Sequence, residues 1–495
     1  SSLAHAVDPM GLQMIEPFIY PAYNAPEKGE LISEVTHLIS NTEYLLSYFT
    51  RQPFADWRIL DAAKLEVFRI ITLGITGFDN ALSLNSMEES AVCLESLRAI
   101  LSFYTGKKSK PLLSDLDAAI EYLHRHPDFD TFDRAVFITR FANRVSAGIA
   151  QLERELPGPD VSYNRMLRQE ALTLFDPDAF NVNAFSPGPE FHLTTAKADL
   201  GKKLFYDASL SGAGMRSCAS CHQPDRAFTD GLTRPVDIYD PSKLLTRNVP
   251  TLLNAALQSN YFYDMRALTL EDQVHDVISN KQEMDGSMEA IIKYVSANRS
   301  YQPLFAKAFP EKAGKGISSD EVANALASYI RSLTKLNSRF DEYMRGREDA
   351  LTKQEIKGLN LFMGKAKCAT CHFIPLFNGI TPPKYVRSET EVLGVPVSLT
   401  DSTLDPDRGY YDIIGIDSYK NAFKIPTVRD INKTAPYMHN GAYQTLEQVM
   451  EFYNNAGAVG LGIDLPNQTL PAEKLNLTEQ EKEDIIAFMK SLDSR

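Results

Sequence analysis

The sequence predicts a mainly α-helical protein, in which an amino-terminal helical bundle is followed by two domains related by duplication. Apolar residues recur at helical spacing, with few strand-like alternations, in segments 31–48, 57–82, 88–104, 112–124 and 132–156, which indicates a bundle. Later, the pentapeptide C-x-x-C-H occurs twice, at residues 218–222 and 368–372. The predicted parts are a bundle (1–165), a linker (166–190), a first domain (191–345) and a second domain (346–495).

Helical spacing also marks most of the later half of the chain. Residues 318–336 form the clearest amphipathic pattern, with Ser318 or Ser319 as the expected N-cap. Thr478 and Glu481 have the spacing of a capping box at the start of the last helix, 478–491. Residues 374–419 lack a helical period, so we expect loops with short strands there. Further helices are expected at 195–205, 270–278, 352–363 and 445–454.

The two C-x-x-C-H copies lie in segments that repeat each other weakly. LGKKLF (200–205) precedes the first copy and KGLNLF (357–362) precedes the second. RNVPTL (247–252) follows the first copy and IPTVR (425–429) follows the second. The agreement on both sides of each motif indicates duplication of one domain.

C-x-x-C-H is the motif in which two thiols bond covalently to the vinyl groups of haem and the histidine becomes an axial ligand of the iron. The two copies use four of the five cysteines. A zinc site made of the same residues is disfavoured, because zinc motifs space their second ligand pair differently. We therefore predict two covalently bound c-type haems in two cytochrome c-like domains, attached through Cys218, Cys221, Cys368 and Cys371, with His222 and His372 as iron ligands.

Composition narrows the classes of partner. The 495 residues are 44% hydrophobic and 23% charged, with a net charge of −13 and no basic run, which argues against nucleic acid and an anionic membrane surface. An acidic surface suits a basic partner, such as a small electron-donor protein. Glu16 and Pro17 interrupt the apolar stretch 9–20, so we expect no signal peptide and no membrane span in this chain. Because bacteria attach covalent haem outside the cytoplasm, we expect a periplasmic or otherwise exported protein whose export signal was removed.

Residues 195–492 resemble the bacterial dihaem cytochrome c peroxidases and their MauG-type relatives. No comparable resemblance covers residues 1–190, so the helical bundle is an addition to the family pattern. The resemblance is carried by GKKLFYD (201–207), the first C-x-x-C-H with AFTDG (227–231), residues 247–254, NSRFD (337–341) and TAPYMHNG (434–441).

The resemblance implies that the first haem, with His222 as proximal ligand, reacts with peroxide. Many members close the far face of this haem with a histidine from the following loop, but residues 223–246 contain none, so we expect an open iron. The family's distal glutamate and glutamine correspond to Glu283 and Gln273. A carboxylate can move a proton between the two peroxide oxygens, and an amide can orient peroxide. His275 is the alternative acid–base group, and both polar residues could instead be ordinary surface residues.

For the second haem, the resemblance places the distal ligand at Tyr453, the residue typical of the MauG-type branch. From the residues alone, a c-type haem takes methionine or histidine as its second ligand, and Met438, His439 and Met450 are alternatives. Tyr453 could also be an ordinary core tyrosine.

Two further features are implied only by the resemblance. The family's Trp-Asp-Gly-Arg run between the haems reads Tyr263-Asp264-Met265-Arg266 here, so Tyr263 becomes the expected electron-transfer bridge, unless it is simply a packed tyrosine. A calcium ion is expected at the side chain of Asn248 and the backbone carbonyls of Thr434 and Pro436, since calcium prefers oxygen ligands.

The leading functional prediction is a dihaem c-type peroxidase that reduces hydrogen peroxide at the first haem with electrons delivered through the second. The donor would be a small protein, either a c-type cytochrome or a cupredoxin. The alternative is a MauG-type oxidase that uses peroxide to oxidise a protein or organic substrate over a distance. A dihaem electron carrier is the third possibility, against which Glu283 and Gln273 argue. A homodimer is compatible with each of them.

Overall fold

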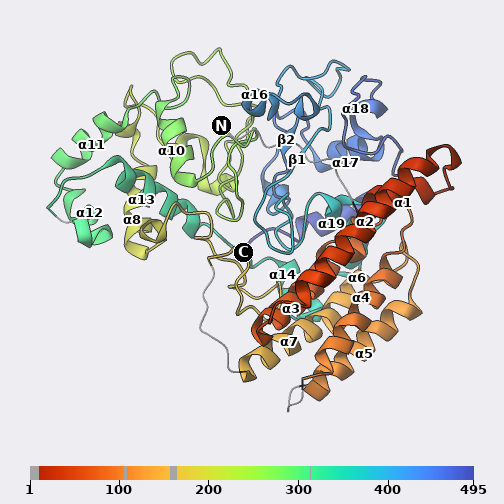
Figure 1. Ribbon diagram of the computed structural model, residues 1–495. Helices are drawn as coiled ribbons and strands as arrows, with labels where there is room; N and C mark the ends of the chain where they lie inside the picture. The colour runs from red at the N-terminus through yellow and green to blue at the C-terminus, as the bar shows by residue number, and fades with distance from the viewer. Residues whose placement is uncertain (1–10, 105–108, 157–163, 313) are drawn as a thin grey trace. The chain divides into compact units, whose positions relative to one another are not determined.

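The computed structural model describes residues 11–104, 109–156, 164–312 and 314–495 (Figure 1). The mainly helical class predicted from the sequence is confirmed. The chain forms two compact units. The first contains the described residues of Ser1–Val161 with Leu172–Leu174 and Met363–Thr370, and the second those of Ser162–Ala171, Phe175–Phe362 and Cys371–Arg495.

The first unit is a helical bundle. Helix α3 packs against α7, α4 against α5, and α5 against α7, and Figure 1 shows these helices together in the orange part of the chain. Their apolar faces form the core, in which Leu60, Phe68, Leu116 and Ile149 are fully buried. The helices are α1 (Leu12–Ile19), α2 (Lys28–Phe49), α3 (Asp56–Thr72), α4 (Ser86–Leu101), α5 (Ser109–Arg125), α6 (Arg134–Phe137) and α7 (Asn143–Glu155).

Two predicted helices of the bundle are interrupted. The helix expected at 57–82 ends at Thr72, and a 3₁₀ turn, Gly74–Thr76, follows it. Gly77 then adopts φ +79°, a left-handed conformation that ends helices and that glycine adopts without strain. The helix expected at 132–156 contains a π-helical turn at Ile138–Ala142. The predicted end of the helix at 57–82 was therefore wrong. The backbone leaves the α-helical conformation there, although apolar residues continue at helical spacing.

The second unit contains the remaining helices and two short strands. Strand β1 (Thr390–Glu391) pairs antiparallel with β2 (Phe423–Lys424). Ser318 caps α13 in a capping box with Glu321, and Thr478 caps α19 with Glu481, as expected. The helices are α8 (Thr195–Phe205), α9 (Cys218–Cys221), α10 (Leu270–Ser279), α11 (Met288–Ala297), α12 (Gln302–Ala308), α13 (Ser319–Ser332), α14 (Arg339–Met344), α15 (Lys353–Met363), α16 (Tyr411–Ile414), α17 (Leu446–Asn454), α18 (Gly457–Gly460) and α19 (Glu479–Lys490).

The duplication seen in the sequence recurs in the packing. Gly201 of α8 lies so close to α13 that a Cβ atom would stand 1.8 Å from the carbonyl oxygen of Ala325. Gly358 of α15 meets α19 in the same way, with 1.9 Å to the carbonyl oxygen of Asp484. In each half, a glycine before the C-x-x-C-H motif therefore allows the preceding helix to cross a later helix at backbone contact.

Candidate haem-binding sites

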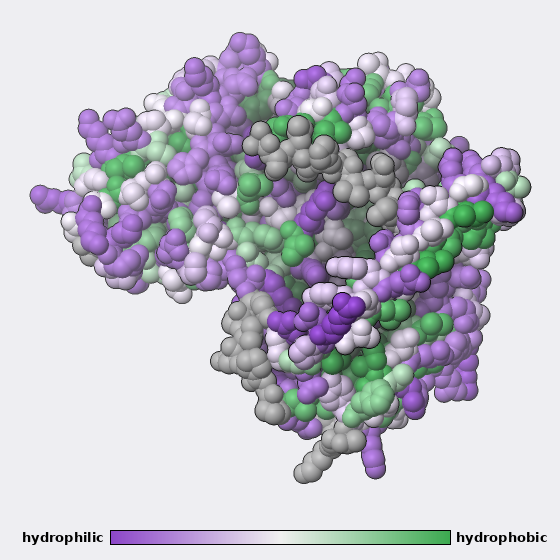
Figure 2. Space-filling view, viewed as in Figure 1, coloured by the Kyte–Doolittle hydropathy of each residue, from purple (hydrophilic) through white to green (hydrophobic). Residues whose placement is uncertain are grey.

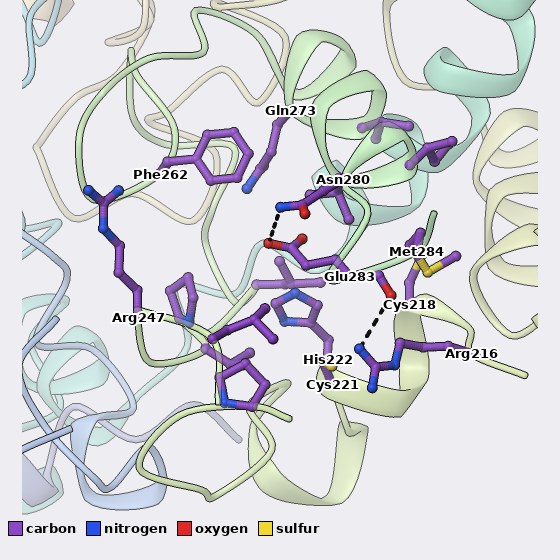
Figure 3. Close-up of a pocket in the computed structure, with 18 of the residues that line it drawn as sticks. Arg216, Cys218, Cys221, His222, Arg247, Phe262, Gln273, Asn280, Glu283 and Met284 are labelled. Carbon is purple, nitrogen blue, oxygen red and sulfur yellow. Dashed lines mark hydrogen bonds between the residues drawn. The ribbon is translucent and has the colours of Figure 1, made fainter. Parts of the chain in front are cut away.

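A cavity of about 250 Å³ in the second unit holds the first C-x-x-C-H motif. Cys218, Cys221 and His222 line it, and Figure 3 shows the His222 ring inside it. Apolar side chains such as Leu252 and Leu326 form much of the remaining wall. The cavity therefore combines two thiols, an imidazole and an apolar lining, as an apolar macrocycle with a central iron requires.

The two motif histidines are held in the same way. His222 Nδ1 donates to the carbonyl oxygen of Phe228 at 2.9 Å, and His372 Nδ1 lies 3.3 Å from that of Phe377 and 3.1 Å from that of Pro426. These bonds leave Nε2 of each ring as the nitrogen that can bind iron. Burial lowers the pKa of His222 and lowers that of His372 to about 4, so both imidazoles are neutral, as ligation requires.

The motif cysteines are buried side chains with perturbed pKa values. Burial raises the pKa of Cys218 to about 12 and that of Cys221 to about 11. In the second motif, burial raises the pKa of Cys368 to about 12. Cys218, Cys221 and Cys368 are therefore neutral thiols, and no disulfide joins the motif cysteines, so they are in the reduced form from which a thioether is made. The residues present in both motifs fit a covalently attached haem.

The predicted distal residues line the same cavity as His222. Gln273 extends from α10, and Glu283 comes from the turn that follows this helix. Asn280 Nδ2 donates to Glu283 Oε1 at 3.0 Å, and Figure 3 shows the ends of all three side chains turned toward one region. Burial raises the pKa of Glu283, while Arg266 and Arg216 act against that shift. His275, the alternative acid–base group, is not among the residues that line this cavity.

Arg216 is a cavity residue that the sequence analysis missed. Its guanidinium donates to the carbonyl oxygens of Gln282 and Glu283, each at 3.3 Å, and to that of Val236 at 3.0 Å. It thereby connects the segment just before Cys218 to the backbone that carries Glu283. Arg216 lies two residues before the motif and Asn280 three residues before Glu283, but neither position carries a sequence pattern that predicts these contacts.

Tyr263 also lines the cavity. Burial raises its pKa to about 12, with a smaller opposing effect from Arg247. Its carbonyl oxygen accepts a hydrogen bond of 2.8 Å from the backbone N–H of Lys424 in β2. Strand β2 pairs with β1, where Glu391 Oε1 lies 3.3 Å from Cys371 Sγ. A short run of contacts thus leads from Tyr263 to the second motif.

The candidate distal ligands of the second haem occupy different surroundings. Tyr453 is half-buried on α17, with its ring 5.7 Å from that of Phe452. Met450, on the same helix, is buried. His439 stacks on Phe423 at 3.8 Å, and its Nε2 lies 3.4 Å from Asp405 Oδ1. These contacts do not select one of the candidates, and Tyr453 remains a prediction.

Asn248, one of the three residues expected to bind calcium, contacts the segment that contains the other two. The backbone N–H of Asn248 donates to the carbonyl oxygen of His439 at 2.7 Å, close in sequence to Thr434 and Pro436. Asn248 Nδ2 donates to the carbonyl oxygens of Leu232 and Thr233, which leaves Oδ1 as an oxygen that can coordinate a cation. Throughout the described residues, no cluster of three or more histidine, cysteine or carboxylate side chains suits a metal ion.

Comparisons with known proteins point in one direction. The family model for di-haem cytochrome c peroxidase matches residues 195–349. The methylamine utilization protein MauG of Methylophilus methylotrophus is 32% identical over 303 residues, which cover 61% of this chain and 83% of that protein. The cytochrome c551 peroxidase of Nitrosomonas europaea is 32% identical over 295 residues, which cover 60% of this chain and 79% of that protein.

Solved structures show the same likeness. A MauG-like protein associated with microbial copper homeostasis aligns with a TM-score of 0.55 and 29% identity, over 62% of this chain and 92% of that chain. The diheme peroxidase BthA from Burkholderia thailandensis aligns with a TM-score of 0.50 and 22% identity, over 61% of this chain and 87% of that chain. It shares the fold. Across the parts of the chain that the structure describes, no helix has the length and apolar character needed to cross a bilayer.

Proposed function

The chain belongs to the di-haem cytochrome c peroxidase family, and we propose that it reduces hydrogen peroxide at a haem held by His222 with electrons delivered through a haem held by His372. It is thus an oxidoreductase with peroxide as electron acceptor. Each turnover consumes two electrons and two protons and releases two water molecules. The proposal assigns the chemical step to the first motif and electron entry to the second.

The observation that carries this proposal is the position of Glu283 in the lining of the His222 cavity. A haem held by His222 would supply an iron that binds peroxide and passes electrons to it. Glu283 accepts the proton of the inner peroxide oxygen and returns it to the outer oxygen, which leaves as water. Gln273 donates to peroxide and orients it, and Asn280 and Arg216 hold Glu283 in place through its carboxylate and its backbone.

Tyr453 is proposed as the distal ligand of the second haem and Tyr263 as the bridge between the haems. Support for Tyr263 comes from its place in the cavity and from the contacts that continue through β2 and β1 to Cys371. A tyrosine releases its phenolic proton on oxidation, so electron transfer through Tyr263 would be coupled to proton transfer. This behaviour would distinguish the chain from relatives with tryptophan at that position.

A MauG-type oxidase is the second candidate, and two sequence features favour it. Residues 223–246 contain no histidine, and a tyrosine occupies position 453. In that case, peroxide would drive oxidation of a protein or organic substrate rather than of a small electron-donor protein.

Steady-state assays separate the candidates. The holoenzyme is mixed with peroxide and either a reduced c-type cytochrome or a reduced cupredoxin, and donor oxidation is followed optically. We expect two donor molecules oxidised per peroxide consumed. Peroxide consumption without donor oxidation, together with covalent or redox change in a candidate protein substrate, would favour the oxidase. If the holoenzyme consumed no peroxide, the result would favour an electron carrier over both enzymes.

We also propose a calcium ion at Asn248, Thr434 and Pro436, and an exported location for the protein. The calcium proposal is supported by the orientation of the Asn248 amide, whose nitrogen is already bonded to carbonyl oxygens. Metal analysis of purified holoenzyme before and after treatment with a calcium chelator tests it, and a holoenzyme without calcium would refute it. Export is supported by the covalent haem motifs, and cell fractionation tests it.

A further inference from the structure

Three aromatic side chains connect the lining of the His222 cavity to the protein surface. Phe205, the last residue of α8, lines the cavity. Its ring meets that of Tyr329 on α13 edge to face, with 5.0 Å between the centroids, and that of Tyr206 in the same way at 5.5 Å. Tyr329 is 7% exposed and Tyr206 is 46% exposed. The contacts therefore lead from the cavity, past a buried tyrosine, to a tyrosine that solvent reaches.

The close crossing of α8 and α13 explains the contact between Phe205 and Tyr329. Gly201 brings the two helices to backbone contact at Ala325. Phe205 follows Gly201 by four residues, and Tyr329 follows Ala325 by four residues. Residues four apart lie on one face of a helix, so each ring extends from the crossing toward the other helix. The glycine of the crossing thereby fixes an aromatic contact at the cavity wall.

The second half of the chain has the same packing without the phenolic hydroxyl groups. Where α15 crosses α19, four residues after the point of closest approach, Phe362 contacts Phe488 with 5.4 Å between the centroids. These phenylalanines correspond to Phe205 and Tyr329, and a methionine follows the first of them where Tyr206 follows Phe205. Packing at such a crossing therefore needs aromatic rings but not hydroxyl groups. The hydroxyls belong to the half to which the peroxide chemistry is assigned.

The hydroxyl groups couple the two tyrosines. Burial and a hydrogen bond to the Tyr206 hydroxyl raise the pKa of Tyr329, so Tyr329 keeps its proton until it is oxidised. A tyrosine loses its phenolic proton when it loses an electron, and the Tyr206 oxygen is the acceptor at hand. Figure 2 shows mainly hydrophilic residues over the part of the surface where α11, α12 and α13 lie in Figure 1. Because Tyr206 is exposed, water can take up the proton that Tyr206 releases in turn.

We propose that Tyr206 is a surface site at which phenolic compounds too large for the cavity are oxidised. The proposal rests on the peroxide reduction assigned to the first motif, and it gives the oxidising equivalents an exit that uses neither Tyr263 nor the second motif. The Phe205 ring is not itself oxidised. It fills the gap between the cavity and Tyr329, and electron tunnelling falls steeply with distance, so rings in contact favour rapid transfer.

The electrons and atoms of this reaction balance. Peroxide takes up two electrons and two protons and becomes two water molecules. Each electron comes from Tyr206 by way of Tyr329, and the proton that Tyr206 releases to water balances one that peroxide takes up. Tyr206 then recovers a hydrogen atom from one phenol, at little cost in free energy because the same kind of O–H bond breaks and forms. Two phenols thus become two phenoxyl radicals, which couple to each other.

Tyramine coupled to dextran tests the site, because the polymer keeps the phenol out of the cavity. Holoenzyme and peroxide are added, and the fluorescence of coupled phenols measures the rate. Tyr206→Phe should lower kcat/KM for this probe at least about tenfold, whereas Tyr206→Trp keeps an oxidisable ring and should retain activity. Tyr239→Phe removes the hydroxyl of another exposed tyrosine of the same unit and should change nothing. Oxidation of a reduced c-type cytochrome should be the same in all of these proteins.

Trapping the radical gives a readout that does not depend on turnover. Peroxide is added to the holoprotein without any donor, in the presence of a nitroso spin trap, and the labelled peptides are identified by mass spectrometry. The wild type should carry the adduct on Tyr206. Tyr329→Phe removes the hydroxyl that relays the electron and proton, and should slow the appearance of this adduct at least about tenfold. An unchanged rate in Tyr329→Phe would contradict the relay.

The outcomes separate this proposal from the proposed function. Cytochrome oxidation without oxidation of the dextran-bound phenol would refute the surface site and leave peroxide reduction in place. Equal oxidation of that phenol by Tyr206→Phe and the wild type, or an adduct confined to another tyrosine, would do the same. A holoenzyme that consumes no peroxide with either donor would refute both.

Discussion

Asn280 Nδ2 donates a hydrogen bond of 3.0 Å to Glu283 Oε1, which fixes a half-buried carboxylate in the lining of the cavity that contains His222. The carboxylate has a pKa raised by burial and an amide donor that favours its ionised form. A carboxyl group whose pKa is raised binds a proton more readily than an ordinary glutamate, which suits a group that takes up and returns a proton. Glu283 is therefore the residue on which the proposed peroxide chemistry depends.

Replacing Glu283 tests its role directly. Glu283→Gln keeps the shape and the Asn280 contact but cannot exchange a proton, so kcat should fall by about 10²- to 10⁴-fold. Steady-state peroxide turnover measures the change, and the haem absorption of the purified variant measures its loading. Glu289→Gln makes the same substitution at an exposed position of α11 and should retain full activity. Equal activity of Glu283→Gln and wild type would exclude Glu283 as the acid–base group.

The pH dependence follows from the direction of the Glu283 pKa shift. Burial raises this pKa above its ordinary value of 4.5, and the proton-accepting form is the carboxylate, which exists above the pKa. The value of kcat/KM should therefore be lost as pH falls through a midpoint above 4.5. Asn280→Ala removes a donor to the ionised carboxylate and should move that midpoint to higher pH. If Asn280→Ala left this midpoint unchanged, the loss of kcat/KM at low pH would not come from protonation of Glu283.

Tyr453 can be tested through the reduction potential of the second haem. Tyr453→Met replaces an anionic oxygen donor with a thioether and should raise that potential by on the order of 100 mV, since axial ligands tune haem potentials over about 0.8 V. Spectroelectrochemical titration measures it. Tyr443→Phe alters a buried tyrosine of the same unit and should leave the potential in place. An unchanged spectrum and potential in Tyr453→Met would reject Tyr453 as the ligand.

Tyr263 can be tested through electron transfer between the haems. Tyr263→Phe should slow it by at least about tenfold, a barrier increase of about 1.4 kcal/mol, and Tyr263→Trp should restore it. Stopped-flow mixing with peroxide, with the second haem pre-reduced, follows its reoxidation, and the wild-type rate should decrease in D₂O because the tyrosine loses its proton. Tyr261→Phe, a buried neighbour outside the cavity lining, is the matched control. If Tyr263→Phe and the wild type transferred electrons between the haems at the same rate, Tyr263 would have only a packing role.

Local signals in the sequence predicted several elements correctly. The N-cap predicted at Ser318 or Ser319 and the capping box predicted at Thr478 gave the starts of α13 and α19, because the residues that satisfy a helix N-terminus lie within three positions of one another. The repeated LGKKLF and KGLNLF segments predicted equivalent helices, and the structure shows why both retain glycine. The C-x-x-C-H motifs predict the haem ligands from covalent chemistry alone, and that assignment stays a prediction.

Features that depend on distant contacts were not predictable in this way. Arg216 connects to Glu283 through backbone carbonyls far along the chain, and such bonds leave no pattern in side-chain type. Helix α3 ended at Thr72 despite continued apolar spacing, and Gly77 ended the 3₁₀ turn that follows it. Gln273 and Glu283 were identified only by resemblance to a family, because polar residues at a helix end usually face solvent. The exposure of α2, which has no buried residue, also needed the structure, since an apolar stripe normally indicates a buried face.

The central claim is that the two haem sites are unequal, with an open iron at His222 and a closed iron at His372. Electron paramagnetic resonance of the resting oxidised holoprotein tests it most directly. The account predicts one high-spin ferric signal, from the first haem, and one low-spin signal, from the second, without prior reduction. Two low-spin signals of equal intensity would mean that both irons carry two protein ligands, and would contradict the account.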